Sequence, residues 1–225
     1  MARDIHDHWF KEAKRAGWRS RAAFKLIEID DKRKVLKPGD RVLDLGAAPG
    51  SWLQVAAERI GSRGLAVGID LQLIRADFPA NNIHVIQGDA AALEPDQLTD
   101  LGLATDVIFD VLLSDMAPAT TGNKDTDHYR SMRLCHLVLD LATRWLRPGG
   151  QLVMKSFEGP ASKELTDRLR EMFETVRPAK PKASRAESRE MFLVGQGRLE
   201  NLEVISPGAD PTGGPPPVRP GWGGV

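Results

Sequence analysis

The stretch RVLDLGAAPGSWLQVAAERIG, residues 41–61, decides the fold of this chain of 225 residues. Residues 41–45 are typical of a short buried strand, and the apolar positions that follow the turn suit one face of a helix, with Ser51 as a candidate N-cap. Gly46 and Gly50 lie at the turn itself, where glycine lets the backbone approach a bound nucleotide closely. Their spacing differs from the G-x-G-x-x-G of dinucleotide-binding turns, so this turn need not wrap a pyrophosphate.

Two acidic residues end the next two predicted strands. Asp70 closes GLAVGID (64–70), and Asp89 closes NIHVIQGD (82–89). An acid at the end of the second strand can accept hydrogen bonds from both hydroxyls of a ribose, and Asp89 can accept one from an adenine amino group. Taken singly, each acid is also a candidate capping or turn residue. Together with the glycine turn, they predict a nucleoside pocket without phosphate-binding features.

Four charged residues that are far apart in the sequence each lie where a strand or helix meets a loop. Asp115 and Lys155 end two apolar runs, Glu190 begins a third, and Lys25 lies in a basic, helix-like stretch. Ligands bind at the carboxyl ends of the strands of an open parallel sheet. Two lysines and two carboxylates that converge there would perturb one another's protonation, as acid/base and electrostatic catalysis require.

Five segments carry a resemblance to a known family. They are RAGWRSRAAFKLIEID (15–30), DLGAAPGSW (44–52), LLSDMAP (112–118), LVMKSFEG (152–159) and KPKASRAESREMFLV (180–194). Motif by motif and in order, they resemble the FtsJ/RlmE ribosomal RNA 2′-O-methyltransferases over roughly residues 4–196. The resemblance implies an α/β, Rossmann-like class I methyltransferase fold, with a seven-stranded, mostly parallel sheet and helices on both faces. It also implies S-adenosyl-L-methionine as the cofactor.

The resemblance also implies site residues. The family's Lys-Asp-Lys-Glu tetrad corresponds to Lys25, Asp115, Lys155 and Glu190, with Glu187 as a rival for the last place. The implied cofactor-binding residues are Gly46, Ala47, Pro49, Gly50, Trp52, Asp70, Leu71, Asp89, Ala90 and Asp115. One feature departs from the family pattern, because Gln72 and Leu73 follow Asp70 where the family often has a proline.

Two roles stay open for Lys155 in such a reaction. A neutral Lys155 would act as the general base that removes the proton of the 2′-hydroxyl. A protonated Lys155 would instead orient that oxygen and stabilise the incipient alkoxide.

The charge is unevenly distributed although the formal net charge is zero. Residues 1–37 hold 11 Lys or Arg against 6 Asp or Glu, and residues 176–190 hold 5 against 2. Residues 38–175, between them, hold 13 against 20. We expect the two basic segments to form one RNA-facing surface, although charge runs are also common on plain solvated faces. The expected RNA-binding residues are Arg19, Arg21, Lys182 and Arg185.

The order of predicted elements suits one doubly wound domain. Strands are expected at about 41–46, 64–70, 83–88, 108–114, 150–156, 173–178 and 190–196, and helices at about 19–34, 51–60, 129–146 and 161–172. We expect a basic helical arm at residues 1–36, a methyltransferase domain at 37–200, and a disordered Pro- and Gly-rich tail at 206–225. The antiparallel last strand is implied by the resemblance alone.

Composition argues against several classes of protein. A single cysteine, Cys135, excludes an internal disulfide, and the five histidines show no metal-ligand spacing, so no metal is expected. No apolar run is long enough to span a membrane, and there is no signal peptide, so we expect a cytoplasmic protein. The expected state is a monomer whose partner is ribosomal RNA within the large subunit.

The expected function is transfer of a methyl group to a ribose 2′-hydroxyl of large-subunit ribosomal RNA, at a uridine of the peptidyl-transferase A-loop on the assembled subunit. One alternative is a 2′-O-methyltransferase that acts on transfer RNA or another RNA. Another is a non-catalytic RNA-binding relative. A small-molecule or base methyltransferase fits less well, because the resemblance implies that those enzymes lack this lysine pair.

Overall fold

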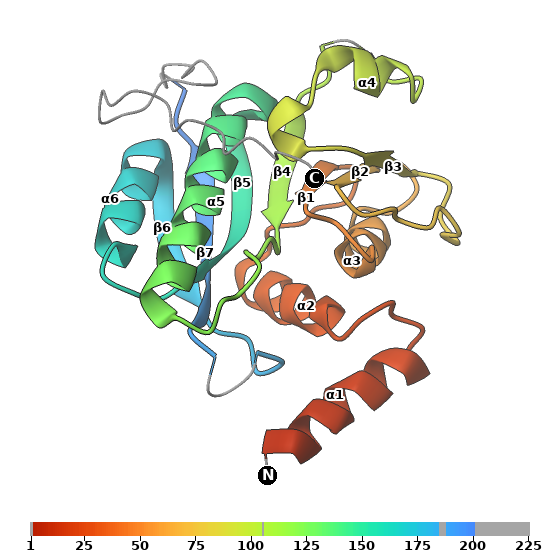
Figure 1. The fold of residues 1–225 in the computed structure, drawn as a ribbon. Coiled ribbons are helices and arrows are strands. Elements are labelled where there is room, and N and C mark those ends of the chain that lie inside the picture. Colours follow the sequence, from red (N-terminus) through yellow and green to blue (C-terminus); the bar gives the residue numbers. More distant parts are fainter. Residues whose placement is uncertain (1, 105, 185–187, 201–225) are drawn as a thin grey trace, which may run out of the picture.

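The computed structural model describes residues 2–104, 106–184 and 188–200, which fold into one sheet with helices on both faces (Figure 1). The strands are β1 (Arg41–Leu45), β2 (Leu65–Asp70), β3 (Ile83–Gln87), β4 (Phe109–Ser114), β5 (Leu146–Phe157), β6 (Phe173–Ala179) and β7 (Glu190–Arg198). The helices are α1 (Ala2–Arg15), α2 (Ala22–Arg33), α3 (Ser51–Ile60), α4 (Pro95–Thr99), α5 (Lys124–Trp145) and α6 (Ser162–Met172), with a short 3₁₀ helix, η1 (Ala90–Ala92).

The seven strands lie in the order β3-β2-β1-β4-β5-β7-β6. Strands β1 to β5 pair in parallel, whereas β7 is antiparallel to both β5 and β6. This is the Rossmann-like arrangement that the family resemblance implied, including the antiparallel last strand. The chain leaves β1 toward β2 and β3 and then returns to β4 on the other side of β1. The crevice between the carboxyl ends of β1 and β4 is therefore a topological switch point, where open sheets bind ligands.

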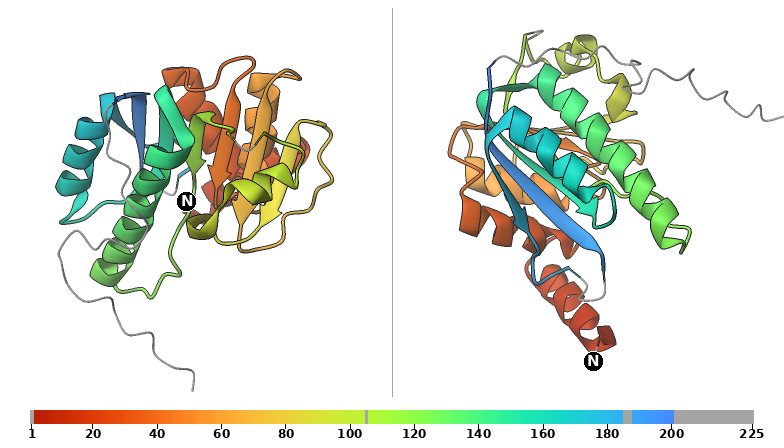
Figure 2. Two further views of the ribbon diagram at one scale, coloured as in Figure 1. Left: turned by 90° about the horizontal axis from the view of Figure 1, so that it is seen from above. Right: turned by 90° about the vertical axis from the view of Figure 1, so that its left-hand side faces the viewer.

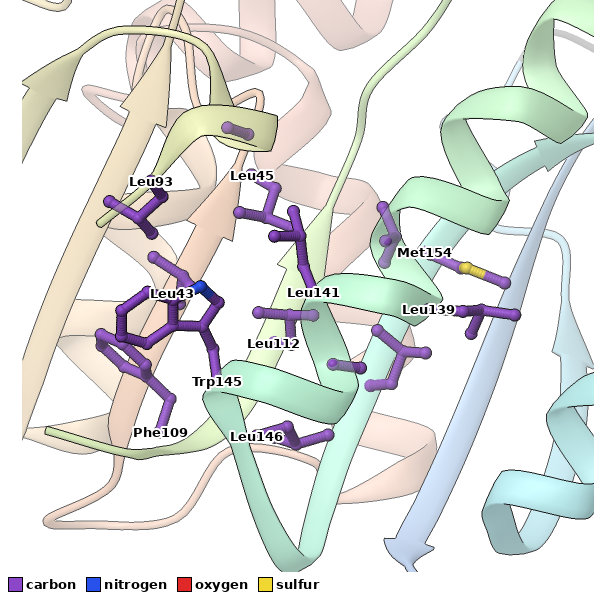
Figure 3. Close-up of a cluster of buried hydrophobic side chains, with 14 of the residues drawn as sticks. Leu43, Leu45, Leu93, Phe109, Leu112, Leu139, Leu141, Trp145, Leu146 and Met154 are labelled. Carbon is purple, nitrogen blue, oxygen red and sulfur yellow. The ribbon is translucent and has the colours of Figure 1, made fainter. Parts of the chain in front are cut away.

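Each face of the sheet has its own apolar core because side chains alternate along a strand. Leu43 and Leu45 of β1 face α5, where Leu141 and Trp145 cover them (Figure 3). The alternate position Val42 faces the opposite side and packs in a cluster with residues of α2 and α3. Helices α5 and α6 thus cover one face and α2 and α3 the other, as the views in Figure 2 show.

Several boundaries differ from the sequence-based expectation. Helix α5 begins at Lys124 rather than 129, because Asn123 caps it by accepting hydrogen bonds from the backbone of the next turn. Strand β5 begins at Leu146 rather than 150, and its pairing with β4 is irregular between Leu146 and Gln151. The expected cap at Ser51 is wrong: Gly50 is the N-cap of α3, and the Ser51 hydroxyl instead bonds that of Ser20. Helices α1, α4 and η1 were not predicted as separate elements.

The N-terminal arm comprises two helices joined by a turn. Helix α1 extends beyond the body of the domain and contacts α2, with the rings of Trp9 and Phe24 5.1 Å apart (Figure 2). The predicted tail at 206–225 lies outside the described residues. Within the described ranges, no helix is long and apolar enough to cross a membrane. The same part of the chain contains no cluster of His, Cys, Asp or Glu suited to a metal ion.

Candidate functional site

Four charged side chains meet at the carboxyl edge of the sheet. Asp115 follows β4, Lys155 lies near the end of β5, Lys25 lies on α2, and Glu190 begins β7. Lys155 Nζ lies 2.9 Å from Asp115 Oδ1, and Lys25 Nζ lies 2.9 Å from Glu190 Oε2. Lys25 Nζ is also 3.7 Å from Asp115 Oδ1, so Asp115 lies between the two lysines. The structure brings all four predicted residues together, while Glu187 lies outside the described residues.

Strand register accounts for this convergence. The last residue of β4 pairs in parallel with the residue before Lys155, so Asp115 and Lys155 leave the sheet side by side. In the antiparallel pair of β5 and β7, Glu190 lies opposite Phe157, two residues beyond Lys155 and therefore on the same face of the sheet. Lys25 comes from α2, which covers this face.

The cluster is largely shielded from water. The side chains of Lys25 and Lys155 are 9% and 7% exposed. Burial alone would raise the pKa of Glu190, but the charge and hydrogen bond of Lys25, the Ser184 hydroxyl and the charge of Lys155 more than offset it. The pKa of Glu190 is therefore held below its ordinary value, and the carboxylate stays ionised at neutral pH. A cluster of opposite charges in a poorly hydrated site is suited to orienting a substrate hydroxyl.

A cavity of about 460 Å³ opens beside this cluster at the switch point. Its size is that of a small-molecule site. Six of the predicted cofactor-binding residues line it: Gly46, Asp70, Leu71, Asp89, Ala90 and Asp115. Asp115 thus belongs both to the charged cluster and to the wall of the cavity. Met116, Leu134 and Leu137 add an apolar wall that the sequence analysis did not predict, because they are single apolar residues within other elements.

Glycine is required at the turn that forms one side of the cavity. Gly46 has φ 75°, and a Cβ there would collide with the side chain of Met116. Gly50 has φ 101°, and a Cβ there would lie 2.7 Å from Cζ of Phe78. Any other residue would be strained at these positions and would crowd the turn. Gly46 lines the cavity, and the close backbone approach to a bound nucleoside stays a prediction.

The two predicted pocket acids both hold backbone groups in the structure. Asp70 accepts hydrogen bonds from Ala48 N at 2.9 Å and from Gln72 N at 2.7 Å. Asp89 caps η1 by accepting a hydrogen bond from Ala91 N at 3.0 Å. Each carboxylate oxygen can accept more than one hydrogen bond, so both acids can still receive hydroxyl or amino donors from a ligand.

Asp44 is a functional candidate that the sequence analysis missed. It lies in β1, two residues before Gly46, and it is 1% exposed. Neither of its carboxyl oxygens has a hydrogen-bond partner among the described residues. Burial, together with the charges of Asp115 and Asp70, raises the pKa of Asp44 well above its ordinary value. The available signal was a carboxyl in the middle of the apolar run RVLDL.

These features fit the cofactor that the resemblance implied. S-adenosyl-L-methionine carries a nucleoside, a sulfonium and an ammonium group. The cavity offers an apolar wall, acids for hydroxyl and amino donors, and a turn without side chains at Gly46. The carboxyl of Asp44 is buried, has no hydrogen-bond partner within the described ranges, and feels the charges of two wall acids, so it is suited to a neighbouring positive charge.

The other predicted cofactor residues are not among the residues that line the cavity. Ala47, Pro49 and Gly50 belong to the turn that precedes α3. Trp52 is 3% exposed and donates from Nε1 to the Ala22 carbonyl at 2.8 Å. Its indole packs between α2 and β7, so the residue joins elements of the core, and a direct role in cofactor binding stays a prediction.

The predicted RNA-binding residues have different surroundings. The guanidinium of Arg19 contacts Pro49, Arg75, Asp77 and Phe78. The backbone of Lys182 donates to Glu28 Oε2 at 2.7 Å, which places the loop after β6 against α2. Arg21 lies just before α2, and Arg185 lies outside the described residues. The two basic segments are therefore neighbours, as expected, and their contact with RNA stays a prediction.

Comparison with known proteins gives a consistent result. The profile of the family described as FtsJ-like methyltransferase matches residues 18–198. The chain is 44% identical over 195 residues to the "Ribosomal RNA large subunit methyltransferase E" of Syntrophobacter fumaroxidans, covering 87% of this chain and 97% of that protein. It is 43% identical over 192 residues to the protein of that name from Methanothermobacter thermautotrophicus, covering 84% and 89%.

Two solved structures have related folds. A crystal structure of a putative ribosomal RNA methyltransferase from Plasmodium falciparum has a TM-score of 0.71 at 33% identity, covering 82% of this chain and all of that one. The fibrillarin of Aeropyrum pernix, solved with bound S-adenosyl-L-methionine, has a TM-score of 0.54 at 20% identity, covering 77% and 73%. The second likeness shows the fold alone.

Proposed function

Because this chain belongs to the FtsJ-like methyltransferase family, we propose that it transfers a methyl group from S-adenosyl-L-methionine to a ribose 2′-hydroxyl of large-subunit ribosomal RNA. The observation that carries the proposal is the position of Asp115, which lines the cavity and binds both catalytic lysines. A donor in the cavity and a ribose beside the lysines would meet at this residue.

The choice of substrate rests on the relatives. Proteins named as large-subunit ribosomal RNA methyltransferases match this chain over nearly their full length. The finer assignment, a uridine of the peptidyl-transferase A-loop on the assembled subunit, is part of the same proposal. The two basic segments, held side by side by the contact between Lys182 and Glu28, supply a surface for the RNA backbone.

The donor supplies an electrophilic methyl group, so the task of the protein is to align the ribose oxygen and to manage its proton. Lys155 Nζ donates to Asp115 Oδ1 and to the main-chain oxygen of Asp115. An ammonium has three N–H groups, so one remains for the 2′-oxygen. This arrangement favours a protonated Lys155 that orients the oxygen and stabilises its developing negative charge, while the hydroxyl proton leaves to water.

The remaining members of the cluster hold that geometry. Asp115 fixes the direction of Lys155, while Glu190 fixes Lys25 and is itself held by Ser184. Lys25 contributes a second positive charge beside the reacting oxygen. In a shielded site such preorganised charges contribute more than they would in water.

Two alternatives share these residues. A methyltransferase for transfer RNA or another RNA would use the same ribose chemistry, and the names of the relatives favour ribosomal RNA over it. A non-catalytic RNA-binding relative is disfavoured, because all four charged residues are present and mutually paired.

The decisive experiment incubates the purified protein and radiolabelled donor with large subunits isolated from cells that lack the enzyme. We expect label in the large-subunit RNA, mapped to one ribose by primer extension at low nucleotide concentration. Free large-subunit RNA and transfer RNA serve as parallel substrates. Label in transfer RNA alone would show that transfer RNA, and not ribosomal RNA, is the substrate. If the protein binds the donor but labels no RNA, the result would favour a non-catalytic RNA-binding protein.

A further inference from the structure

The side chain of Arg19 contacts both the glycine turn and the loop that follows β2. Its guanidinium Nη1 donates to the Pro49 carbonyl at 3.0 Å and to the Arg75 carbonyl at 2.7 Å. Nη2 forms an ion pair of 2.5 Å with Asp77 Oδ1. The guanidinium carbon lies 3.7 Å from the centre of the Phe78 ring. Arg19 therefore connects the N-terminal arm with the glycine turn and with the segment that follows β2.

The backbone of Arg19 is also held in place. Its backbone N–H donates to Gln54 Oε1 at 2.8 Å, and Gln54 in turn donates to the Gly17 carbonyl at 3.1 Å. Gln54 lies on α3, which begins directly after the glycine turn. Because both ends are held, the side chain, only 16% exposed, acts as a rigid link between α3 and the next loop.

The segment at the other end of this link contributes to the cavity. Residues 71–82 connect β2 to β3 without a helix, and their first two residues, Leu71 and Gln72, line the cavity. Leu71 is 71% exposed, so little packing holds it in place. A loop of this kind adopts one conformation only where specific contacts hold it. Arg19, which does not belong to this segment, donates hydrogen bonds to the Arg75 carbonyl and to Asp77 Oδ1.

Phe78 completes the arrangement on the side of the glycine turn. A Cβ at Gly50 would lie 2.7 Å from Cζ of Phe78 and 3.1 Å from Nη1 of Arg19. The aromatic ring and the guanidinium therefore pack directly against the turn, and a side chain at position 50 would have no room. Arg19 and Phe78 therefore both contact the glycine turn at Gly50.

We propose that Arg19 is a positioning residue of the cofactor site, which preforms the wall at Leu71 and Gln72 by holding the loop 71–82 against the glycine turn. The proposal rests on the proposed function, since it takes the cavity to be the donor site. It gives Arg19 a different role from the RNA contact expected from the sequence. A guanidinium that donates to two carbonyls and a carboxylate has few N–H groups left for a phosphate.

The test compares Arg19→Gln with Arg75→Gln. Arg75 lies in the loop 71–82 that Arg19 contacts, and its replacement by Gln removes the same charge. Its side chain is 83% exposed, and among the described residues its charge forms a 3.7 Å ion pair with Asp77. Calorimetry measures the affinity for S-adenosyl-L-methionine, and methylation of large subunits gives the KM for the donor and kcat. We expect Arg19→Gln to raise the donor Kd and KM about tenfold or more, with kcat restored at saturating donor. Arg75→Gln should leave both within about twofold.

Two further variants keep the outcome clear. Arg19→Lys keeps the charge but cannot form the planar fork, so its donor Kd should lie near that of Arg19→Gln. Asp77→Asn keeps an oxygen acceptor but removes the charge that pairs with Arg19 and Arg75, so it should give a smaller rise in the donor Kd. This variant tests the proposal even if Arg19→Gln folds poorly.

A wild-type donor Kd in Arg19→Gln and Arg19→Lys would overturn the proposal. So would a loss of RNA affinity in Arg19→Gln with unchanged donor affinity, because that result would assign Arg19 to the RNA surface. If the wild-type protein bound no donor at all, the proposed function itself would fail, and this result is distinguishable from both.

Discussion

Lys155 donates a hydrogen bond to Asp115 Oδ1 at 2.9 Å and a second one to the main-chain oxygen of the same residue. Asp115 therefore accepts from two of the three N–H groups of the Lys155 ammonium. The third N–H group is left for a substrate, and Asp115 also lines the cavity beside it. This pairing links the place where the ribose oxygen would be held to the place where the methyl donor would bind.

Removing the Lys155 ammonium should abolish nearly all methyl transfer. We expect Lys155→Ala to lower kcat about 10²- to 10³-fold or more, because a group that stabilises developing charge is lost. Lys155→Arg should be nearly as poor, since a planar guanidinium cannot reproduce the direction of the ammonium. Methylation of isolated large subunits measures the effect, and donor affinity by calorimetry should stay close to wild type.

The same assay ranks the other members of the cluster. Asp115→Ala should approach Lys155→Ala, and Lys25→Ala should also be severe. Glu190→Ala should be milder, because Glu190 pairs with Lys25 whereas Asp115 pairs with Lys155 itself. Wild-type turnover in Lys155→Ala would remove the tetrad assignment and send the search for the site elsewhere along the sheet edge.

Glu190 should make the stability of the fold sensitive to acid. Its pKa is lowered in the folded state, so its stabilisation is fully present above the ordinary value of 4.5 and is lost as the pH falls through the folded pKa. Glu190→Gln should therefore be less stable than wild type at pH 7, with the difference vanishing well below pH 4.5. Urea unfolding at several pH values measures this gap. Glu171→Gln, on the exposed side of α6, is the matched control and should show no such trend.

Much of the sheet could be predicted from the sequence because its strands are apolar runs with acidic or glycine residues at their ends. The run before Asp115 and the run before Lys155 both became parallel strands whose ends meet. The start of α5 was missed because residues 124–128 are polar and show no helical periodicity. The cap at Asn123, which depends on backbone geometry, determines where that helix begins.

The side-chain partners within the site could not be predicted in the same way. Arg19 was expected on an RNA surface from its charge alone, whereas its direction depends on where the loop 71–82 passes in three dimensions. Asp44 interrupts the apolar run RVLDL, but it was overlooked because its burial is visible only in the structure. Residues that face a shared edge are predictable from strand ends, but the contacts that orient them depend on the tertiary fold.

The basic segments should give RNA binding that depends on salt. Neutralised phosphates release counterions, so each Lys or Arg that contacts a phosphate contributes about one unit to the slope of log K against log salt. Lys182→Gln should lower that slope by about one unit and raise the KM for large subunits, while leaving donor affinity unchanged. Lys163→Gln is the control, because Lys163 lies on α6, on the opposite face of the sheet from α2. Equal slopes for both variants and wild type would mean that Lys182 only faces solvent.

The buried carboxyl of Asp44 should lower the stability of the fold at neutral and alkaline pH. Its pKa is raised in the folded state, so its contribution to stability is fully present below the ordinary value of 3.8 and is lost as the pH rises through the folded pKa. Asp44→Asn has nearly the same shape and cannot ionise. We expect this variant to be more stable than wild type at pH 8, by about 1–3 kcal/mol, and to lose that advantage in acid. Urea unfolding across this pH range measures the difference.

The same substitution should weaken the donor site. A bound cation beside the cavity would offset the charge of a buried carboxylate that has no partner among the described residues, and a neutral amide cannot provide that attraction. We therefore expect Asp44→Asn to raise the donor Kd about tenfold, with Asp100→Asn, an exposed residue after α4, unchanged. Unaltered donor affinity in Asp44→Asn would show that the carboxyl has no part in binding the cofactor. A variant that is less stable than wild type at every pH would show that Asp44 makes a stabilising hydrogen bond in solution.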